Sequence, residues 1–157
     1  MVAYRLVHKL YGKSLSASGL PGRWNGAGKK VIYCAESIAL AFLENMVRRQ
    51  GVGFNKDFCT MIIDIPDDLK ISIVKPVDLE AGWRNIRDYS KCQPVGNKWY
   101  DQKDFPVLKV PSAILPVENN FVINTLHKGF NKIKVIEIAN LLPDIKIENI
   151  LKMNKIR

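Results

Sequence analysis

Cysteine and histidine are scarce in this sequence, and neither residue type forms a motif. Three cysteines, Cys34, Cys59 and Cys92, are spread over 157 residues without a CxxC pair. This spacing indicates neither a zinc site nor a disulfide framework, so reduced thiols in the cytoplasm are the simplest interpretation. The two histidines, His8 and His127, are too few and too isolated for a convincing metal site, and we expect no metal.

Long apolar segments are also missing. No stretch approaches the roughly 20 apolar residues that a membrane-spanning helix needs. Residues 1–13 carry several basic side chains and lack the apolar core of a signal peptide. We therefore expect a cytoplasmic protein with no membrane partner. The length suits one domain that buries roughly 70% of its unfolded surface. Since no linker divides the chain, we treat residues 1–157 as a single domain.

Positive charge is in excess, with 24 Lys and Arg residues against 15 Asp and Glu residues and a formal net charge of +9. The cations are spread along the chain instead of forming one basic tail, and such a surface attracts anions. No helix-turn-helix, zinc-finger or aromatic RNA-binding motif is present, so direct nucleic-acid binding is not our first expectation. A non-catalytic basic module that binds nucleic acid or an acidic protein remains an alternative.

Many short apolar segments and only one clear helix follow one another along the chain. An N-capping Ser37 and a closing Gly51 predict a helix that ends near residue 49. A second, short helix is predicted at 79–84, the tail 141–153 is helix or loop, and residues 12–28 form a long glycine-rich loop. Strands are predicted at residues 2–8, 30–35, 59–65, 71–74, 108–114, 120–124 and 133–139. This pattern predicts an α+β fold.

Glu44 lies at the border of the apolar face of the predicted helix. At about 100° per residue, the apolar arc consists of Ala39, Leu40, Phe42, Leu43, Met46 and Val47. A carboxylate at this border can face a cleft while its helix is anchored in the core. The alternative is an ion pair with Arg48 one turn later, which would stabilise the helix by a few tenths of a kcal/mol.

Arg23 lies in the glycine-rich loop, within Gly22-Arg23-Trp24-Asn25. A planar guanidinium suits bidentate binding of phosphate or ribose oxygens, and nearby glycines let backbone amides approach a ligand. The alternative is a turn with a surface arginine and with Trp24 in the core. Neither GxGxxG nor GxxxxGKS is present, so this is not a Rossmann or P-loop site.

Tyr33, Ser112 and His127 each allow two interpretations. Tyr33 is either a half-buried strand residue or an aromatic ring that stacks on a ligand. Ser112 is either an exposed hydroxyl or a group that hydrogen-bonds a ligand or orients the glutamate, and its context is not that of a hydrolase nucleophile. His127 is either structural or a general base.

Several short motifs occur in a fixed order. They are Tyr4-Arg5, Gly22-Arg23-Trp24-Asn25, Gly28, Tyr33, Leu40-Ala41-x-Leu43-Glu44, Gly96-x-x-Trp99, Val110-Pro111-Ser112-Ala113, Asn120 and Asn124-x-x-His127. This order resembles the RES domain family, which is named for an arginine, a glutamate and a serine, here Arg23, Glu44 and Ser112. The resemblance covers about residues 4–130. One departure is that the family's Asn-Pro-x-His-Pro motif has lost both prolines around His127.

The resemblance implies a bacterial toxin of a toxin–antitoxin pair, with a fold similar to ADP-ribosyltransferases and with NAD+ as its substrate. It also implies an Xre-type DNA-binding antitoxin as partner, and a homodimer within their complex. By carry-over, Arg23 with Trp24 and Asn25 would hold NAD+, Tyr33 would stack near the nicotinamide, and Glu44 would be the catalytic carboxylate. Ser112 would complete the pocket, with Asn124 as a helper.

The chemistry of nicotinamide release suits these residue types. Breaking the nicotinamide–ribose bond builds positive charge on the ribose, and one nearby carboxylate stabilises that charge as it develops. Nicotinamide leaves as a neutral ring, so a strong general acid is unnecessary. Water as acceptor gives hydrolysis, phosphate gives phosphorolysis, and a protein side chain gives ADP-ribosylation. The sequence leaves all three open.

Overall fold

The computed structural model describes residues 1–50, 57–141, 144, 146–147 and 149. These residues form one seven-stranded sheet in the order β4-β5-β6-β2-β1-β3-β7. Only β4 and β5 are parallel; the other neighbouring strands are antiparallel. The strands are β1 (Val2–His8), β2 (Val31–Ala35), β3 (Phe58–Asp64), β4 (Ile71–Ile73), β5 (Val107–Pro111), β6 (Asn119–Asn124) and β7 (Lys134–Asn140). The α+β class is confirmed, and the sheet is mostly antiparallel.

Each predicted strand is present, and one ends early. The strand predicted at 108–114 stops at Pro111, after which the Ser112 amide donates to the Glu118 carbonyl and the chain turns. The predicted helix is α1 (Ile38–Arg48), and Ser37 caps it by accepting from the Leu40 amide at 3.0 Å. Gly51, which was expected to close this helix, and most of the 141–153 tail lie outside the described residues.

A second α-helix, α2 (Gln93–Gln102), contradicts the expectation of a short helix at 79–84. Residues 79–84 form turns after the 3-10 helix η2 (Pro76–Asp78). The sequence of α2 contains Pro94 and Gly96, which are poor helix formers, so its pattern was missed. Packing of Trp99 and Tyr100 into the core stabilises this helix instead. Two more 3-10 helices, η1 (Lys9–Tyr11) and η3 (Lys128–Lys132), complete the fold.

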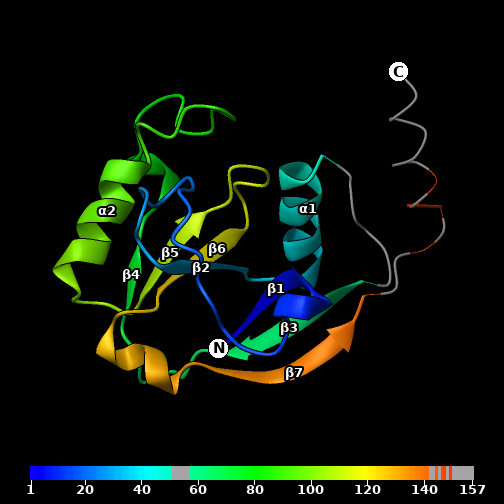
Figure 1. Ribbon diagram of the computed structural model, residues 1–157. Helices are drawn as coiled ribbons and strands as arrows, with labels where there is room; N and C mark the ends of the chain where they lie inside the picture. Colours follow the sequence, from blue (N-terminus) through cyan, green and yellow to red (C-terminus); the bar gives the residue numbers. More distant parts are fainter. Residues whose placement is uncertain (51–56, 142–143, 145, 148, 150–157) are drawn as a thin grey trace.

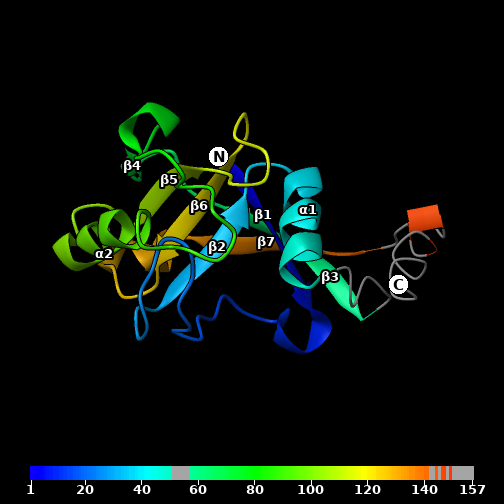
Figure 2. The same cartoon turned by 90° about the horizontal axis from the view of Figure 1, so that it is seen from above.

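Both α-helices cover the same face of the sheet but different halves of it (Figure 1). On β2, Val31, Tyr33 and Ala35 point to this face. Val31 packs in the cluster around α2, while Ala35 packs with Leu40 of α1. Seen from above, the two helices stand apart on either side of β2 (Figure 2). Tyr33 therefore lies at the boundary between the parts covered by α1 and α2.

The two halves of the sheet are joined narrowly. β1 and β2 share a single registered pair, Tyr4 with Ala35, whereas β1 and β3 pair over the whole of both strands. The opposite face of the sheet carries a continuous apolar core. It includes Ala3, Val7, Ile32, Met61, Ile63, Val107, Phe121 and Ile123, with Leu15, Leu69 and Phe130 packed against them. One face of the sheet thus packs on a continuous apolar core, while the opposite face is divided between α1 and α2.

Close packing joins α2 to the glycine-rich loop. A Cβ atom on Gly96 would lie 1.8 Å from the Trp24 carbonyl oxygen, and the backbone on both sides leaves no room for it. From α2, the Gln93 side chain donates to the Gly22 carbonyl at 2.9 Å, and Asn97 accepts from the Gly26 amide at 2.8 Å. The helix that the sequence did not reveal therefore fixes the loop that carries Arg23.

We expect Gly96→Ala to destabilise the protein by about 2–3 kcal/mol, because the added methyl group forces helix and loop apart. Urea unfolding measures this loss. The exposed Lys98→Ala substitution on the same helix is the control and should change the free energy of unfolding by less than about 0.5 kcal/mol. Equal stability of the two variants would contradict the close packing.

Candidate active site

Glu44 is held over the sheet by two side chains, one in β6 and one just after β5. Its Oε1 atom accepts a hydrogen bond from Ser112 Oγ at 2.8 Å and another from Asn120 Nδ2 at 2.6 Å. Asn120 lies on β6, a central strand paired on both sides, and Ser112 directly follows β5. The carboxylate is therefore fixed from the sheet as well as from its own helix.

The hydroxyl of Ser112 is itself oriented by the backbone. Ser112 is fully buried, and its Oγ atom accepts from the amides of Ile114 and Leu115, both at 3.1 Å. With these two donors in place, the hydroxyl proton is directed to Glu44. Of the two roles considered for Ser112, the structure supports orientation of the glutamate.

The second carboxylate oxygen of Glu44, Oε2, receives no donor from the described part of the chain. Within those residues Glu44 also makes no ion pair with Arg48, so the helix pair considered from the sequence does not form. An ionised carboxylate has room for further donors on each oxygen. Oε2 is thus the oxygen that can receive a hydroxyl group of a ligand.

The start of α1 is fastened to the same loop that holds Ser112. Ser37 Oγ donates to Glu118 Oε2 at 2.6 Å, and the Glu118 backbone pairs with that of Ser112. Glu36 accepts from the amide of Asn119 at 2.7 Å. The Ser37–Glu118 bond thus joins the start of α1 to the 112–118 loop.

Tyr33 ties the glycine-rich loop to the sheet. Its hydroxyl donates to Asn25 Oδ1 at 2.7 Å and accepts from the Trp24 amide at 3.0 Å. Burial raises the pKa of Tyr33 above its ordinary value, although the Trp24 amide and the charges of Arg48 and Arg23 act the other way. The charges of both arginines therefore reach this phenol.

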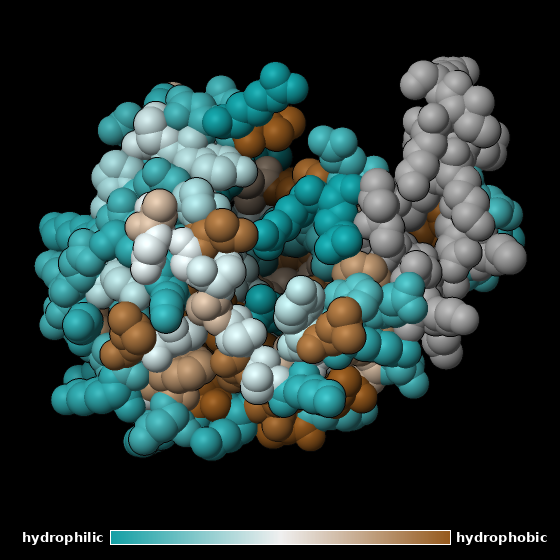
Figure 3. Space-filling view, viewed as in Figure 1, coloured by the Kyte–Doolittle hydropathy of each residue, from teal (hydrophilic) through white to brown (hydrophobic). Residues whose placement is uncertain are grey.

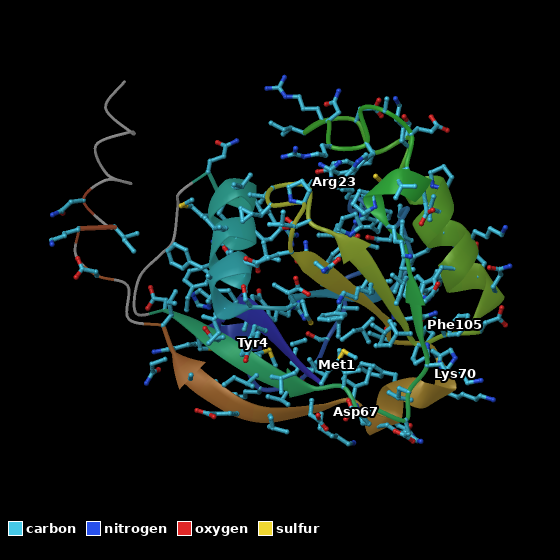
Figure 4. All side chains as sticks on the ribbon, turned by 180° about the vertical axis from the view of Figure 1, so that it is seen from behind. Met1, Tyr4, Arg23, Asp67, Lys70 and Phe105 are labelled. Atoms are coloured by element: carbon cyan, nitrogen blue, oxygen red, sulfur yellow. The ribbon has the colours of Figure 1, made fainter. Side chains whose placement is uncertain are left out.

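Arg23 connects the loop to the segment that precedes α2. Its guanidinium donates to the carbonyl oxygens of Trp83 at 2.5 Å and Asn85 at 3.0 Å, and it lies 4.9 Å from the ring centre of Tyr89. Figure 4 places Arg23 between α1 and the α2 side of the molecule. Three of its five N–H donors are not used in these two bonds and can meet an anion.

A groove separates α1 from the part of the molecule that contains α2 (Figure 3). Glu44 belongs to α1, whereas Arg23 is bound to the segment that precedes α2. The charge of Arg48, one turn beyond Glu44, acts on Tyr33 and also on Arg5 of β1. A carboxylate and positive charges thus act in the same region, which suits a ligand with a positive centre and a polyanionic arm.

The other predicted ligand-binding residues lie under the surface. Trp24, Asn25 and Asn124 are almost completely buried. Asn25 donates to the Leu20 carbonyl at 2.9 Å, and Asn124 donates to the Tyr100 carbonyl at 3.2 Å. The structure gives all three a supporting role; their contact with a ligand remains a prediction.

His127 also has a structural partner. Its Nδ1 atom accepts from the Gly129 amide at 2.9 Å, which starts η3, and Asn124 Oδ1 accepts from the Leu126 amide at 3.0 Å. This loop is therefore closed by side chains where the family motif has prolines.

Two residues that position the site were not assigned a role from the sequence. Asn120 was noted only as part of the motif order, and Gln93 was not noted. The polar Asn120 in an apolar strand was the available signal, because a buried-facing amide needs a partner. Nothing in the local pattern marked Gln93, since its helix was not predicted.

The described residues contain no cluster of three His, Cys, Asp or Glu side chains that could hold a metal ion. In the same part of the chain, no helix has the length and apolar character to cross a membrane. All three cysteines are free and buried.

Comparison with known proteins decides the family. The family model described as RES domain matches residues 3–144. The chain belongs to the RES domain family. It is 34% identical over 134 residues to a protein named Toxin Res from Yersinia enterocolitica, which covers 83% of this chain and 88% of that protein. The Photorhabdus laumondii protein of the same name is 34% identical over 136 residues, covering 84% and 86%.

A third relative carries a more specific name. A Sphingobium protein named Prs ADP-ribosylating toxin is 32% identical over 125 residues, covering 78% of each chain. The predicted family resemblance is confirmed, and the match to the RES model includes Arg23, Glu44 and Ser112.

We expect Tyr33→Phe to lower the free energy of unfolding by about 1–3 kcal/mol at neutral pH, because Asn25 and Trp24 each lose a buried partner.

Unfolded tyrosine ionises near pH 10, whereas folded Tyr33 resists ionisation because its pKa is raised. Stability of the wild type should therefore fall as pH rises above about 10, and Tyr33→Phe should show a smaller fall. Urea unfolding at neutral pH and above about pH 10 measures the free energy of unfolding of wild type and variant. Substitution of the exposed Tyr11, Tyr11→Phe, is the control. A Tyr33→Phe variant as stable as the control would contradict the assigned bonds.

Proposed function

We propose that this chain is an NAD+-consuming toxin of a toxin–antitoxin pair that cleaves the nicotinamide–ribose bond of NAD+. The observation that carries the proposal is the Glu44 carboxylate, with Oε1 held by Ser112 and Asn120 and with Oε2 left available. Membership of the RES family and the names of its relatives support the role as a toxin. An ADP-ribosyltransferase-like fold and a cognate Xre-type antitoxin belong to the same proposal.

The reacting half of NAD+ fits the charges of the groove. As nicotinamide departs, the ribose gains positive charge, and a carboxylate fixed beside it stabilises the transition state more than the ground state. In the proposed arrangement, Oε2 of Glu44 accepts the 2′-hydroxyl of that ribose. Because Oε1 is already bound, Glu44 needs no reorganisation at the moment of reaction.

The diphosphate arm fits the guanidinium groups. The charges of Arg23 and Arg48 both act on Tyr33, which we propose lies next to the nicotinamide ribose. Arginine binds phosphate oxygens through paired N–H donors, and holding the diphosphate fixes the reactive bond against Glu44. The Tyr33 ring, whose hydroxyl is committed to the loop, offers its face for stacking.

The acceptor distinguishes three candidate reactions. The name of the Sphingobium relative favours transfer of ADP-ribose to a protein, as the second candidate function. Glycohydrolysis or phosphorolysis would need only water or phosphate. All three reactions share the same first step, so Glu44 has the same role in each.

The purified protein, freed of any antitoxin, should release nicotinamide from NAD+, which chromatography measures. We expect Glu44→Gln to reduce the rate at least roughly 100-fold, because the neutral amide cannot stabilise the cationic ribose. Its fold should be intact, since the amide oxygen can still accept from Ser112 and Asn120. The exposed Glu137→Gln substitution on β7 is the matched control and should retain full activity.

Three reaction conditions identify the acceptor. Plain buffer, phosphate buffer, and a bacterial extract with labelled NAD+ test water, phosphate and protein in turn. Label that appears on protein establishes transfer, whereas release without label establishes hydrolysis or phosphorolysis. If the wild type leaves NAD+ intact in all three, the proposed function is wrong.

A further inference from the structure

Asn120 has a contact that neither family membership nor the names of the relatives assigns to it. Its Nδ2 atom makes the shortest hydrogen bond described for Glu44, at 2.6 Å. We propose that Asn120 is a positioning residue that, together with Ser112, fixes the orientation of the Glu44 carboxylate so that its second oxygen faces the substrate. The kinetic part of this inference rests on the proposed function.

The strand that carries Asn120 is well suited to this task. On one side Asn120 pairs with Ala35 of β2, and on the other with Val110 of β5. A residue in the middle of three paired strands has little backbone freedom, so its amide defines a fixed point for Glu44. Ala35 packs beneath α1 in the cluster with Leu40, which places Asn120 directly beside the helix that carries Glu44.

Two donors on one oxygen have a specific consequence. A carboxylate attached to a helix by a flexible side chain can rotate and exchange its two oxygens. With Ser112 and Asn120 both bound to Oε1, such rotation would break two charge-assisted hydrogen bonds at once. A single hydrogen bond from Ser112 would still let the carboxylate group of Glu44 rotate. The second hydrogen bond, from Asn120, therefore fixes the orientation of the carboxylate, with Oε2 toward the groove.

The neighbouring Asn119 offers a matched control. It also donates to a glutamate, through its amide nitrogen at 2.7 Å and its Nδ2 atom at 3.1 Å, but that glutamate is Glu36 at the start of α1. Asn119→Ala removes a side-chain amide that binds a carboxylate without touching Glu44. Any effect common to both asparagines is structural, and any effect confined to Asn120 is positional.

For Asn120→Ala we expect kcat for nicotinamide release to fall roughly 10- to 100-fold, with KM within about threefold of wild type, because the substrate still binds but the carboxylate is misaligned. Asn119→Ala should keep kcat within about threefold of wild type. Equal kcat for Asn120→Ala and Asn119→Ala would overturn the inference.

Asn120→Asp supplies a pH signature. A second carboxylate beside Glu44 can donate a hydrogen bond only while the pair shares a proton, and the two repel each other when both are ionised. The activity of Asn120→Asp relative to wild type should therefore rise as pH is lowered from about 8 to about 6. A ratio that does not change with pH would count against the contact, because a purely structural defect has no such dependence.

A readout without substrate separates this inference from the proposed function. In protein labelled with ¹³C at the glutamate carboxyl groups, the Glu44 signal should move in Asn120→Ala and stay in place in Asn119→Ala. A moved signal with no NAD+ cleavage by the wild type would refute the proposed function and support the positioning. An unmoved signal would overturn the positioning, whatever the activity.

Discussion

The hydrogen bonds from Ser112 and Asn120 to one oxygen of Glu44 are the interaction on which the rest of the site depends. They join α1, the end of β5 and the start of β6 at one carboxylate. Much of the surrounding structure keeps these elements in register. Ser37 caps α1 and binds Glu118, and Ser112 is oriented by two backbone amides. An ionised group that is already held at one oxygen can act on a developing charge at the other without reorganising.

A second network holds the opposite wall of the groove. Tyr33 fastens the glycine-rich loop to β2, Gln93 fastens it to α2, and Arg23 joins it to the carbonyls of residues 83 and 85. Tyr33 lies on β2 and Asn120 on β6, and β2 pairs with β6 over its whole length. The two networks are therefore anchored on neighbouring strands of the sheet.

The sequence predicted the strands, α1 and the family because these depend on local patterns and motif order. It could not decide the role of individual residues. Glu44 was also compatible with an ion pair to Arg48, and only the position of Asn120 in space shows which partner it takes. Helix α2 was missed since Pro94 and Gly96 weaken its local signal, and Gly96 is required by the Trp24 carbonyl, a contact between segments far apart in sequence. Trp24, Asn25 and Asn124 were expected at the ligand, and their burial follows from packing that no periodicity reveals.

The most direct measurement is a crystal structure of the wild-type protein with carba-NAD+, an analogue whose nicotinamide bond resists cleavage. The account predicts that Glu44 Oε1 remains on Ser112 and Asn120. It also predicts that Oε2 accepts a hydroxyl of the nicotinamide ribose and that Arg23 or Arg48 contacts the diphosphate. An analogue bound outside the groove between α1 and α2, or Glu44 turned away from the ribose, would contradict it.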